Sequence, residues 1–185
     1  MIILFGVVGS GKSEQAKRLI SRLSCPYIST SLLIRQQRNP RWEAVMMMGK
    51  LLSDQEIISL IEPELNKIDA QHKEFILDGA PRSITQAQWL LNKVETGKLK
   101  LTAIIYLKVS KEITVQRLLK RGRDDDKEEI ISERFRQYEE ITTPVLYYLR
   151  KHGLQIHEVD GSLSIDEVEK QIWEVLKGKI ETKVG

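Results

Sequence analysis

The sequence predicts an α/β fold in which a five-stranded parallel sheet is flanked by helices. Short apolar segments of strand length recur five times along the chain, and amphipathic helical patterns separate them. Such an alternation is typical of parallel sheets with right-handed crossover connections. Three of the apolar segments are almost continuous runs of Ile, Leu, Val and Phe, as expected for parallel strands that are buried on both faces.

The length and composition indicate one globular domain. The chain has 185 residues, and domains usually contain roughly 100–200. Its 29 basic and 26 acidic residues nearly balance, so we expect no nucleic-acid partner. The single cysteine, Cys25, excludes an internal disulfide and a cysteine-rich structural zinc site. No segment reaches the roughly 18 apolar residues of a membrane span, and the apolar start lacks a signal peptide's basic region, so we expect a cytoplasmic protein without a membrane partner.

The elements can be placed in order along the chain. The expected strands cover residues 2–7, 26–29, 74–78, 102–109 and 153–159. Apolar residues at helical spacing predict helices over 12–23, 85–94, 110–121 and 164–176. Ser110 is the expected N-cap of the third helix, and Ser164 and Glu167 form a capping box at the start of the fourth.

Two further regions are predicted to be helical. Residues 30–71 contain helical patterns and no strand, so we expect them to stand as a helical flap. Residues 127–152 are helical but contain Pro144, which should kink or split the helix. Thr142 or Thr143 would then cap the second half.

A glycine-rich motif predicts a phosphate-binding loop. Residues 6–13, Gly-Val-Val-Gly-Ser-Gly-Lys-Ser, match G-x-x-x-x-G-K-[ST] in full, between an apolar strand and an amphipathic helix. The glycines let backbone N–H groups turn toward a phosphate, and the helix N-terminus adds its positive end. Lys12 supplies a charge for the β- and γ-phosphates, and the Ser13 hydroxyl can bind Mg²⁺. This loop alone does not separate ATPases, GTPases and kinases.

Four more segments carry a resemblance to a known family. Residues 28–35, Ile-Ser-Thr-Ser-Leu-Leu-Ile-Arg, resemble I-S-T-G-D-x-L-R, and 49–54, Gly-Lys-Leu-Leu-Ser-Asp, resemble G-K-L-V-[ST]-D. Residues 77–82, Leu-Asp-Gly-Ala-Pro-Arg, with Gln86 and Ala87, resemble L-D-G-F-P-R-x-x-x-Q-A. The arginine cluster near the end comprises Arg117, Arg121, Arg123 and Arg134. In these motifs, and over nearly its whole length, the chain resembles the adenylate kinases.

The resemblance implies a monomeric nucleoside monophosphate kinase domain over residues 1–185 with the three-layer P-loop fold. It implies reversible transfer of the terminal phosphoryl group of ATP to AMP, with Mg²⁺. The core would comprise 1–29, 62–121 and 127–185, the AMP-binding flap about 30–61, and a short lid about 122–126. Two alternatives remain open: a kinase for another monophosphate such as CMP, UMP or dAMP, and a catalytically silent nucleotide-binding protein of the same fold.

The resemblance also implies roles for individual residues, and their chemistry suits those roles. Arginine fits phosphate sites because its planar fork binds two oxygens at once, and a glutamine amide can pair with the N6 amine and N1 of adenine. ATP would be bound by Gly9, Ser10, Gly11, Lys12, Ser13, Glu14, Arg117 and Arg121. AMP would be bound by Thr30, Arg35, Gly79, Arg82, Gln86, Arg123 and Arg134. The catalytic residues would be Lys12, Arg82, Arg121, Arg123 and Arg134, and the Mg²⁺ residues Ser13 and Asp78, the latter through water.

The chain departs from the family pattern at three places. Ser31-Leu32 replaces Gly-Asp, Ala80 replaces Phe, and Glu14 replaces Thr. Glu14 suits the first turn of a helix but brings negative charge near bound phosphates. In the lid, Asp125 and Asp126 are expected to pair with the lid arginines.

Overall fold

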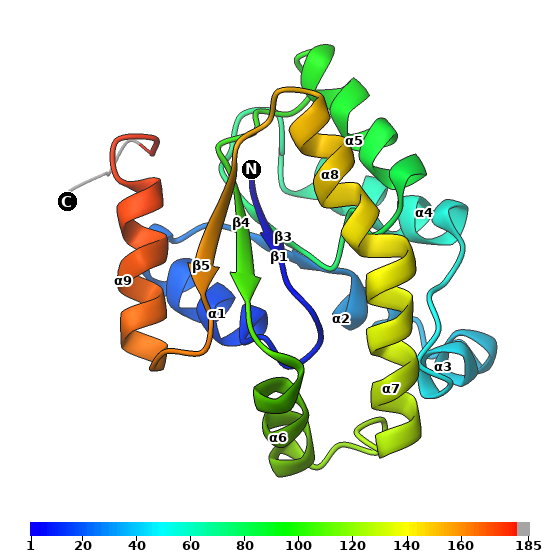
Figure 1. The fold of residues 1–185 in the computed structure, drawn as a ribbon. Coiled ribbons are helices and arrows are strands. Elements are labelled where there is room, and N and C mark those ends of the chain that lie inside the picture. The colour runs from blue at the N-terminus through cyan, green and yellow to red at the C-terminus, as the bar shows by residue number, and fades with distance from the viewer. Residues whose placement is uncertain (181–185) are drawn as a thin grey trace.

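The computed structural model describes residues 1–180, so the last five residues of the predicted core segment 127–185 lie outside the described part. A five-stranded sheet forms its centre (Figure 1). The strands are β1 (Ile2–Phe5), β2 (Tyr27–Ser29), β3 (Ile76–Asp78), β4 (Ala103–Lys108) and β5 (Ile156–Asp160). All neighbouring strands pair in parallel, in the order β2-β3-β1-β4-β5. The predicted parallel sheet is therefore confirmed.

The register brings the phosphate-loop motif and Asp78 to one edge of the sheet. β1 lies at the centre, with Ile3 opposite Leu77 of β3 and Ile104 of β4. Leu4 pairs with Asp78, the last residue of β3. Because parallel strands all end at the same edge, the loop after β1 and the carboxylate of Asp78 share the carboxyl edge, where α/β proteins bind ligands.

One face of the sheet packs on the first and last helices. Ile2 and Leu4 of β1 belong to a buried cluster with residues of α1 (Lys12–Leu23) and α9 (Ile165–Leu176). Figure 1 shows α9 to the left of the strands, and α1 overlaps the lower ends of β5 and β4 in this view. The predicted Ser164–Glu167 capping box at the start of α9 is present.

The other face packs on three helices from the middle of the chain. Ile3 and Phe5 share a buried cluster with residues of α4 (Asp54–Lys67), α5 (Ile84–Glu95) and α8 (Thr143–Lys151). Because successive residues of β1 point to opposite faces, one fully apolar strand supports both helical layers. The molecule therefore has three layers, helices on each side of one sheet.

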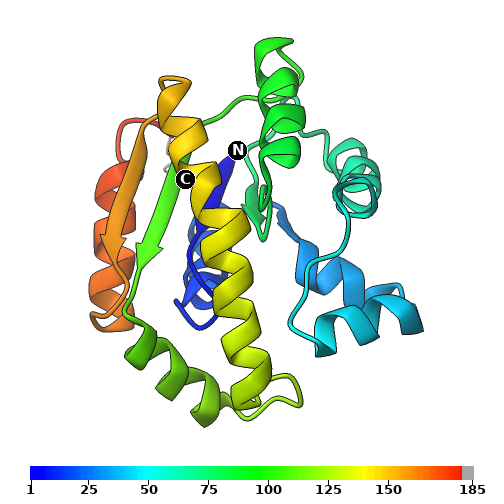
Figure 2. The ribbon, with the colours of Figure 1, turned by 45° about the vertical axis from the view of Figure 1, so that its right-hand side comes forward.

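The region after β2 is helical, as predicted. It forms α2 (Thr30–Gln36), α3 (Pro40–Met47) and α4, and no strand interrupts residues 30–71. In both views α3 stands apart from the sheet, beyond the rod formed by α7 and α8 in Figure 1 (Figures 1 and 2). α4 continues past residue 61, and its second half joins the core through Ile61 and Leu65.

Pro144 disturbs its helix without breaking it. α7 (Glu128–Gln137) passes into a π-helical turn (Tyr138–Thr142) and then into α8, and together they form one long rod (Figure 2). The wider turn lets the chain remain helical before a residue that has no N–H to donate. The predicted threonine cap is wrong: neither Thr142 nor Thr143 caps α8, and the Thr143 hydroxyl instead donates to the Tyr138 carbonyl at 3.2 Å. No helix start exists there that would need a cap.

The remaining helix, α6 (Lys111–Arg121), is capped as predicted, because the Ser110 hydroxyl accepts a hydrogen bond from the Ile113 N–H. No helix within residues 1–180 is long and apolar enough to cross a membrane.

Candidate functional site

A cavity of about 370 Å³ opens at the carboxyl edge of the sheet. Its walls come from the glycine-rich loop, α1, α2, the segment after β3, α6, the lid and α7. Among the residues singled out in the sequence, it is lined by Gly9, Gly11, Lys12, Ser13, Glu14, Thr30, Arg35, Asp78, Gly79, Arg82, Gln86, Arg117, Arg121, Arg123 and Arg134. Ser10 does not line the cavity: it is 2% exposed, and its N–H donates to the Val7 carbonyl within the loop.

The glycine-rich loop needs glycine for its shape. Gly6, Gly9 and Gly11 have φ angles of 149°, 81° and 100°, which residues with a side chain rarely adopt. A Cβ on Gly6 would also lie 2.9 Å from the Leu107 carbonyl oxygen. Because α1 begins at Lys12, directly after Gly11, the free N–H groups of its first turn face the same cavity.

Lys12 reaches back over this loop. Its Nζ donates to the carbonyls of Gly6 at 2.6 Å and Val7 at 3.0 Å. Burial lowers the pKa of Lys12 to about 8, although the charge of Asp78 acts in the opposite direction. The lysine is therefore held against the loop, with a charge that titrates at about pH 8.

Ser13, Asp78 and Tyr27 form a cluster of oxygen atoms beside the loop. Ser13 and Asp78 line the cavity, and the Tyr27 hydroxyl donates to Asp78 Oδ2 at 2.8 Å. Burial and then the neighbouring Asp78 raise the pKa of Tyr27, so its hydroxyl keeps the proton that it donates. A hydroxyl and a carboxylate suit Mg²⁺, which keeps several waters and takes further oxygens from phosphates. Within residues 1–180 no group of three or more His, Cys, Asp or Glu side chains could hold a metal, and such a Mg²⁺ site needs none.

A second cluster lies after β3. The Gly79 carbonyl accepts hydrogen bonds from Arg82 Nε at 2.9 Å and Thr30 Oγ1 at 3.1 Å. The Arg82 N–H donates to Gln86 Oε1 at 2.8 Å, and Gln86 Nε2 donates to Asp54 Oδ1 at 2.8 Å. Burial lowers the pKa of Arg82, which places a desolvated guanidinium at the cavity wall. These bonds join the start of α2 to the segment between β3 and α5.

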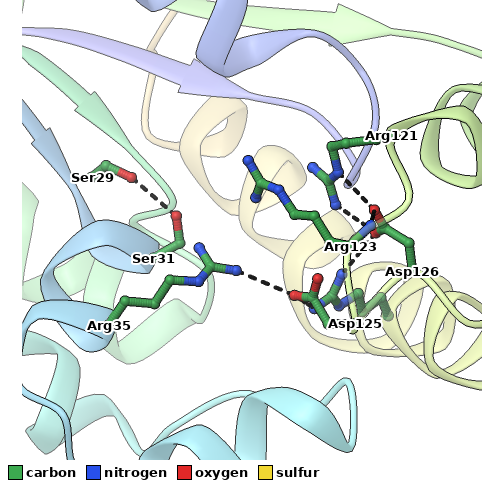
Figure 3. A network of polar contacts seen from close by, with 8 residues as sticks. Ser29, Ser31, Arg35, Arg121, Arg123, Asp125 and Asp126 are labelled. Atoms are coloured by element: carbon green, nitrogen blue, oxygen red, sulfur yellow. Dashed lines mark hydrogen bonds and ion pairs between the residues drawn. The ribbon is translucent and has the colours of Figure 1, made fainter.

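The lid is organised by Asp126. Its carboxylate accepts two hydrogen bonds from Arg121, from Nε at 2.8 Å and from Nη2 at 2.5 Å, and one from the Arg123 N–H at 3.1 Å (Figure 3). Burial acts to raise the pKa of Asp126, but the hydrogen bonds from Arg121 and Arg123 outweigh it and lower the pKa. The sequence-based pairing of the lid aspartates with arginines is confirmed.

Asp125 links the lid to two other elements. It bonds to Arg134 of α7, and its Oδ2 accepts a hydrogen bond from Arg35 of α2 at 3.2 Å. Burial acts to raise the pKa of Asp125, but the hydrogen bond and charge of Arg134 and the charge of Arg35 lower it. Figure 3 shows the guanidinium groups of Arg35, Arg121 and Arg123 turned toward one space.

Two candidate residues sit at the rim. Arg117 donates to the Gly161 carbonyl at 2.8 Å, which ties α6 to the segment after β5. Glu14 lies 3.7 Å from Lys17 and 3.9 Å from Arg18, so two cations on its own helix partly neutralise its charge. This pairing reduces the repulsion expected between Glu14 and a bound phosphate.

The structure adds residues that the sequence did not single out as part of the site. Tyr27 precedes the Ile-Ser-Thr motif and contacts Asp78, and Asp54 ends the Gly-Lys-Leu-Leu-Ser-Asp motif and contacts Gln86. The sequence could have indicated these two residues only through their position in or next to a recognised motif. Tyr138 and Thr142, the first and last residues of the π-helical turn, also line the cavity. No sequence pattern predicted this turn.

Comparisons with known proteins agree with this arrangement. The family model described as "Adenylate kinase" matches residues 4–154. An "Adenylate kinase" of Xanthomonas campestris pv. campestris (strain B100) is 35% identical over 185 aligned positions, covering 95% of this chain and 98% of the relative. One of Parasynechococcus marenigrum (strain WH8102) is 32% identical, covering 95% and 97%. One of Petrotoga mobilis (strain DSM 10674 / SJ95) is 29% identical, also covering 95% and 97%. With a family match over most of its length and relatives that align over 95% of it, the chain belongs to the adenylate kinase family.

Proposed function

We propose that this protein catalyses the reversible reaction ATP + AMP ⇌ 2 ADP. The observation that carries the proposal is that the glycine-rich loop and the segment after β3 line the same cavity. Arginines from the flap, α6, the lid and α7 line it as well. Two phosphate chains can meet there head to head. Because phosphoryl transfer needs positioning and charge more than a protein nucleophile, this arrangement is sufficient for the chemistry.

The glycine-rich loop is the ATP half of the site. Backbone N–H groups of Gly9 and Gly11 cradle the phosphates, and Lys12 leaves the loop carbonyls to bind the β- and γ-phosphates. Ser10, whose N–H is bonded to the Val7 carbonyl, shapes the loop from behind. Glu14 lies at the edge of this half. Arg117 lies on the same face of α6 as Arg121, and we assign it to the adenine of ATP.

The segment after β3 and the start of α2 form the AMP half. Thr30, Gly79 and Gln86 contact the base and ribose side, and Arg35 and Arg82 bind the phosphate. The Arg82 guanidinium is half-buried in the cavity wall, where its interaction with a phosphate is stronger than in open solvent.

Arg121, Arg123 and Arg134 act on the phosphoryl group in transfer. Arg121 and Arg134 are held by the lid aspartates, which positions them for this role. Ser13 and Asp78 would hold Mg²⁺, with Asp78 binding through water. When bound, the ion neutralises charge on the phosphate oxygens.

We further propose that the chain works as a monomer with a core, a flap of about residues 30–61 and a lid of about 122–126. Closure of flap and lid over both nucleotides would exclude water from the transferred group. In support of this arrangement, the two segments already meet through the contact between Arg35 and Asp125.

The test is a coupled assay of ADP formation with ATP, Mg²⁺ and a panel of AMP, dAMP, CMP and UMP. We expect AMP to give the highest kcat/KM. A higher kcat/KM for CMP or UMP would show that the acceptor is a pyrimidine monophosphate. Binding of ATP without ADP formation would show that the protein is a catalytically silent nucleotide-binding protein. The Lys12→Ala variant, purified in the same way, measures any contaminating kinase.

A further inference from the structure

The Gln86 amide is held from two sides. Gln86 is 3% exposed and lines the cavity. The Arg82 backbone N–H donates to its Oε1, and its Nε2 donates to Asp54 Oδ1, each at 2.8 Å. A backbone N–H can only donate and an ionised carboxylate can only accept. The two partners therefore fix which end of the amide is oxygen and which is nitrogen.

Asp54 is well placed to hold this orientation. It is the first residue of α4, and its Oδ1 also accepts a hydrogen bond from the Ser83 hydroxyl at 2.6 Å. Ser83 in turn caps α5 by accepting from the Gln86 N–H at 3.1 Å. Asp54 is not among the residues that line the cavity, so it lies behind Gln86 and reaches a ligand only through it.

The fixed amide presents one pattern to a base. Oε1 can accept one more hydrogen bond, and Nε2 has one more N–H to donate. A 6-aminopurine offers an amine and an unprotonated ring nitrogen, which match this order. A 6-oxopurine offers the opposite order, a carbonyl and a ring N–H, and would need the amide turned around. The turned amide would place its oxygen against Asp54 and its NH₂ against the Arg82 N–H, replacing two hydrogen bonds with two repulsions.

We propose that Asp54 is a positioning residue that orients the Gln86 amide and so makes the acceptor site select 6-aminopurine over 6-oxopurine monophosphates. The inference rests on the proposed function, because it takes Gln86 as the residue that contacts the acceptor base. Without Asp54 only the Arg82 N–H would hold the amide, so Gln86 could turn toward a 6-oxopurine at the cost of one contact instead of two.

The sharpest test is Asp54→Asn, which keeps the size and shape of the side chain. An asparagine amide can turn and donate to a reversed Gln86, and in both orientations it can still bond to Ser83. We expect the ratio of kcat/KM for AMP to kcat/KM for IMP to fall by about tenfold, since the hydrogen bond to a charged carboxylate is replaced by a weaker neutral one that can form in either orientation. The KM for ATP and the melting temperature should stay close to those of the wild type.

Two further variants separate positioning from stability. Ser83→Ala removes the cap of α5 but leaves the Gln86–Asp54 bond, so it should lower the melting temperature and keep the AMP-to-IMP ratio. Asp54→Ala should lower the ratio as Asp54→Asn does. The inference would be overturned if folded Asp54→Asn kept the wild-type AMP-to-IMP ratio, or if Ser83→Ala lowered that ratio equally. The proposed function would remain intact in either case. A wild-type protein that forms no ADP from AMP would overturn both.

Discussion

Arg35 of α2 donates a hydrogen bond to Asp125 of the lid, across 90 residues of sequence, at 3.2 Å. The same carboxylate bonds to Arg134 of α7, so one buried aspartate holds two arginines that we assign to the AMP phosphate. If these arginines bind phosphate as proposed, phosphate oxygens would compete with the Asp125 carboxylate for them.

Asp125→Ala should therefore destabilise the ligand-free protein more than the liganded one. Arg134 is only 15% exposed, and losing its partner should cost about 1–3 kcal/mol of unfolding free energy. Saturation with ATP and AMP should reduce the difference in unfolding free energy between the variant and the wild type, because phosphates then pair with the arginines. Thermal unfolding with and without nucleotides measures both effects. Asp124→Ala, at the exposed neighbouring position, is the matched control. An equal loss in both states would show that Asp125 does not share its arginines with phosphate.

Lys12→Ala should lower kcat by at least roughly 10²-fold, because a preorganised charge at the transferred group is lost. Its Nζ bonds to loop carbonyls, so the melting temperature should be measured alongside turnover. Lys17→Ala is the control, since Lys17 lies on the same helix with a side chain that is 75% exposed. Near-normal turnover in a folded Lys12→Ala protein would remove Lys12 from the mechanism.

The binding of ATP should weaken as the pH rises through about 8. Burial lowers the pKa of free Lys12 to about 8, and a bound polyphosphate favours the charged lysine and so raises this pKa. Below pH 8 Lys12 is charged both with and without bound ATP, so it causes no pH dependence of the affinity there. Above it, binding takes up a proton, and Kd should rise by up to about tenfold per pH unit. Titration calorimetry from pH 7.5 to 9.5 measures the slope. Lys12→Arg should bind ATP with no slope over this range, and a sloping profile in that variant would assign the effect to another group.

Gln86→Ala should raise the KM for AMP and leave the KM for ATP nearly unchanged. The loss of a paired contact to the base should cost about 1–3 kcal/mol. Steady-state kinetics with each nucleotide varied in turn provides the comparison. Gln137→Ala is a control, because Gln137 also lines the cavity but bonds to Glu133 on its own helix. A rise in the KM for ATP alone would mean that the two nucleotide sites have been placed the wrong way round.

The sequence predicted the parts of the molecule that depend on local pattern. The runs Ile2–Phe5 and Ala103–Lys108 became inner strands because all their residues except the terminal Lys108 are of types that favour burial on both faces. The motif ending in Lys12 and Ser13 predicted the loop, because its glycines are needed for backbone angles that other residues avoid.

Features that depend on packing between distant segments were not predicted. Pro144 predicted a kink or a split, and the sequence did not show that the chain would pass it through a π-helical turn and remain helical. The bond from Gln86 to Asp54 spans 32 residues, and the bond from Tyr27 to Asp78 spans 51. Each partner was visible in or beside a motif, but the pairing required the relative placement of α4, α5 and two strands.

The two halves of the cavity should bind a single bisubstrate molecule, two adenosines joined by five phosphates. Lys12 at one end and Gln86 at the other line the same space, so one ligand can reach both. Joining the halves avoids the cost of a second association, so it should bind more tightly than ATP or AMP. Its phosphates would pair with the guanidinium groups that gather around the cavity, from Arg82, Arg121, Arg123 and Arg134. We expect inhibition competitive with ATP and with AMP, one inhibitor per chain by calorimetry, and a raised melting temperature through ligand linkage. Two independent inhibitors per chain, or affinity no higher than that for ATP, would mean that no acceptor site faces the glycine-rich loop.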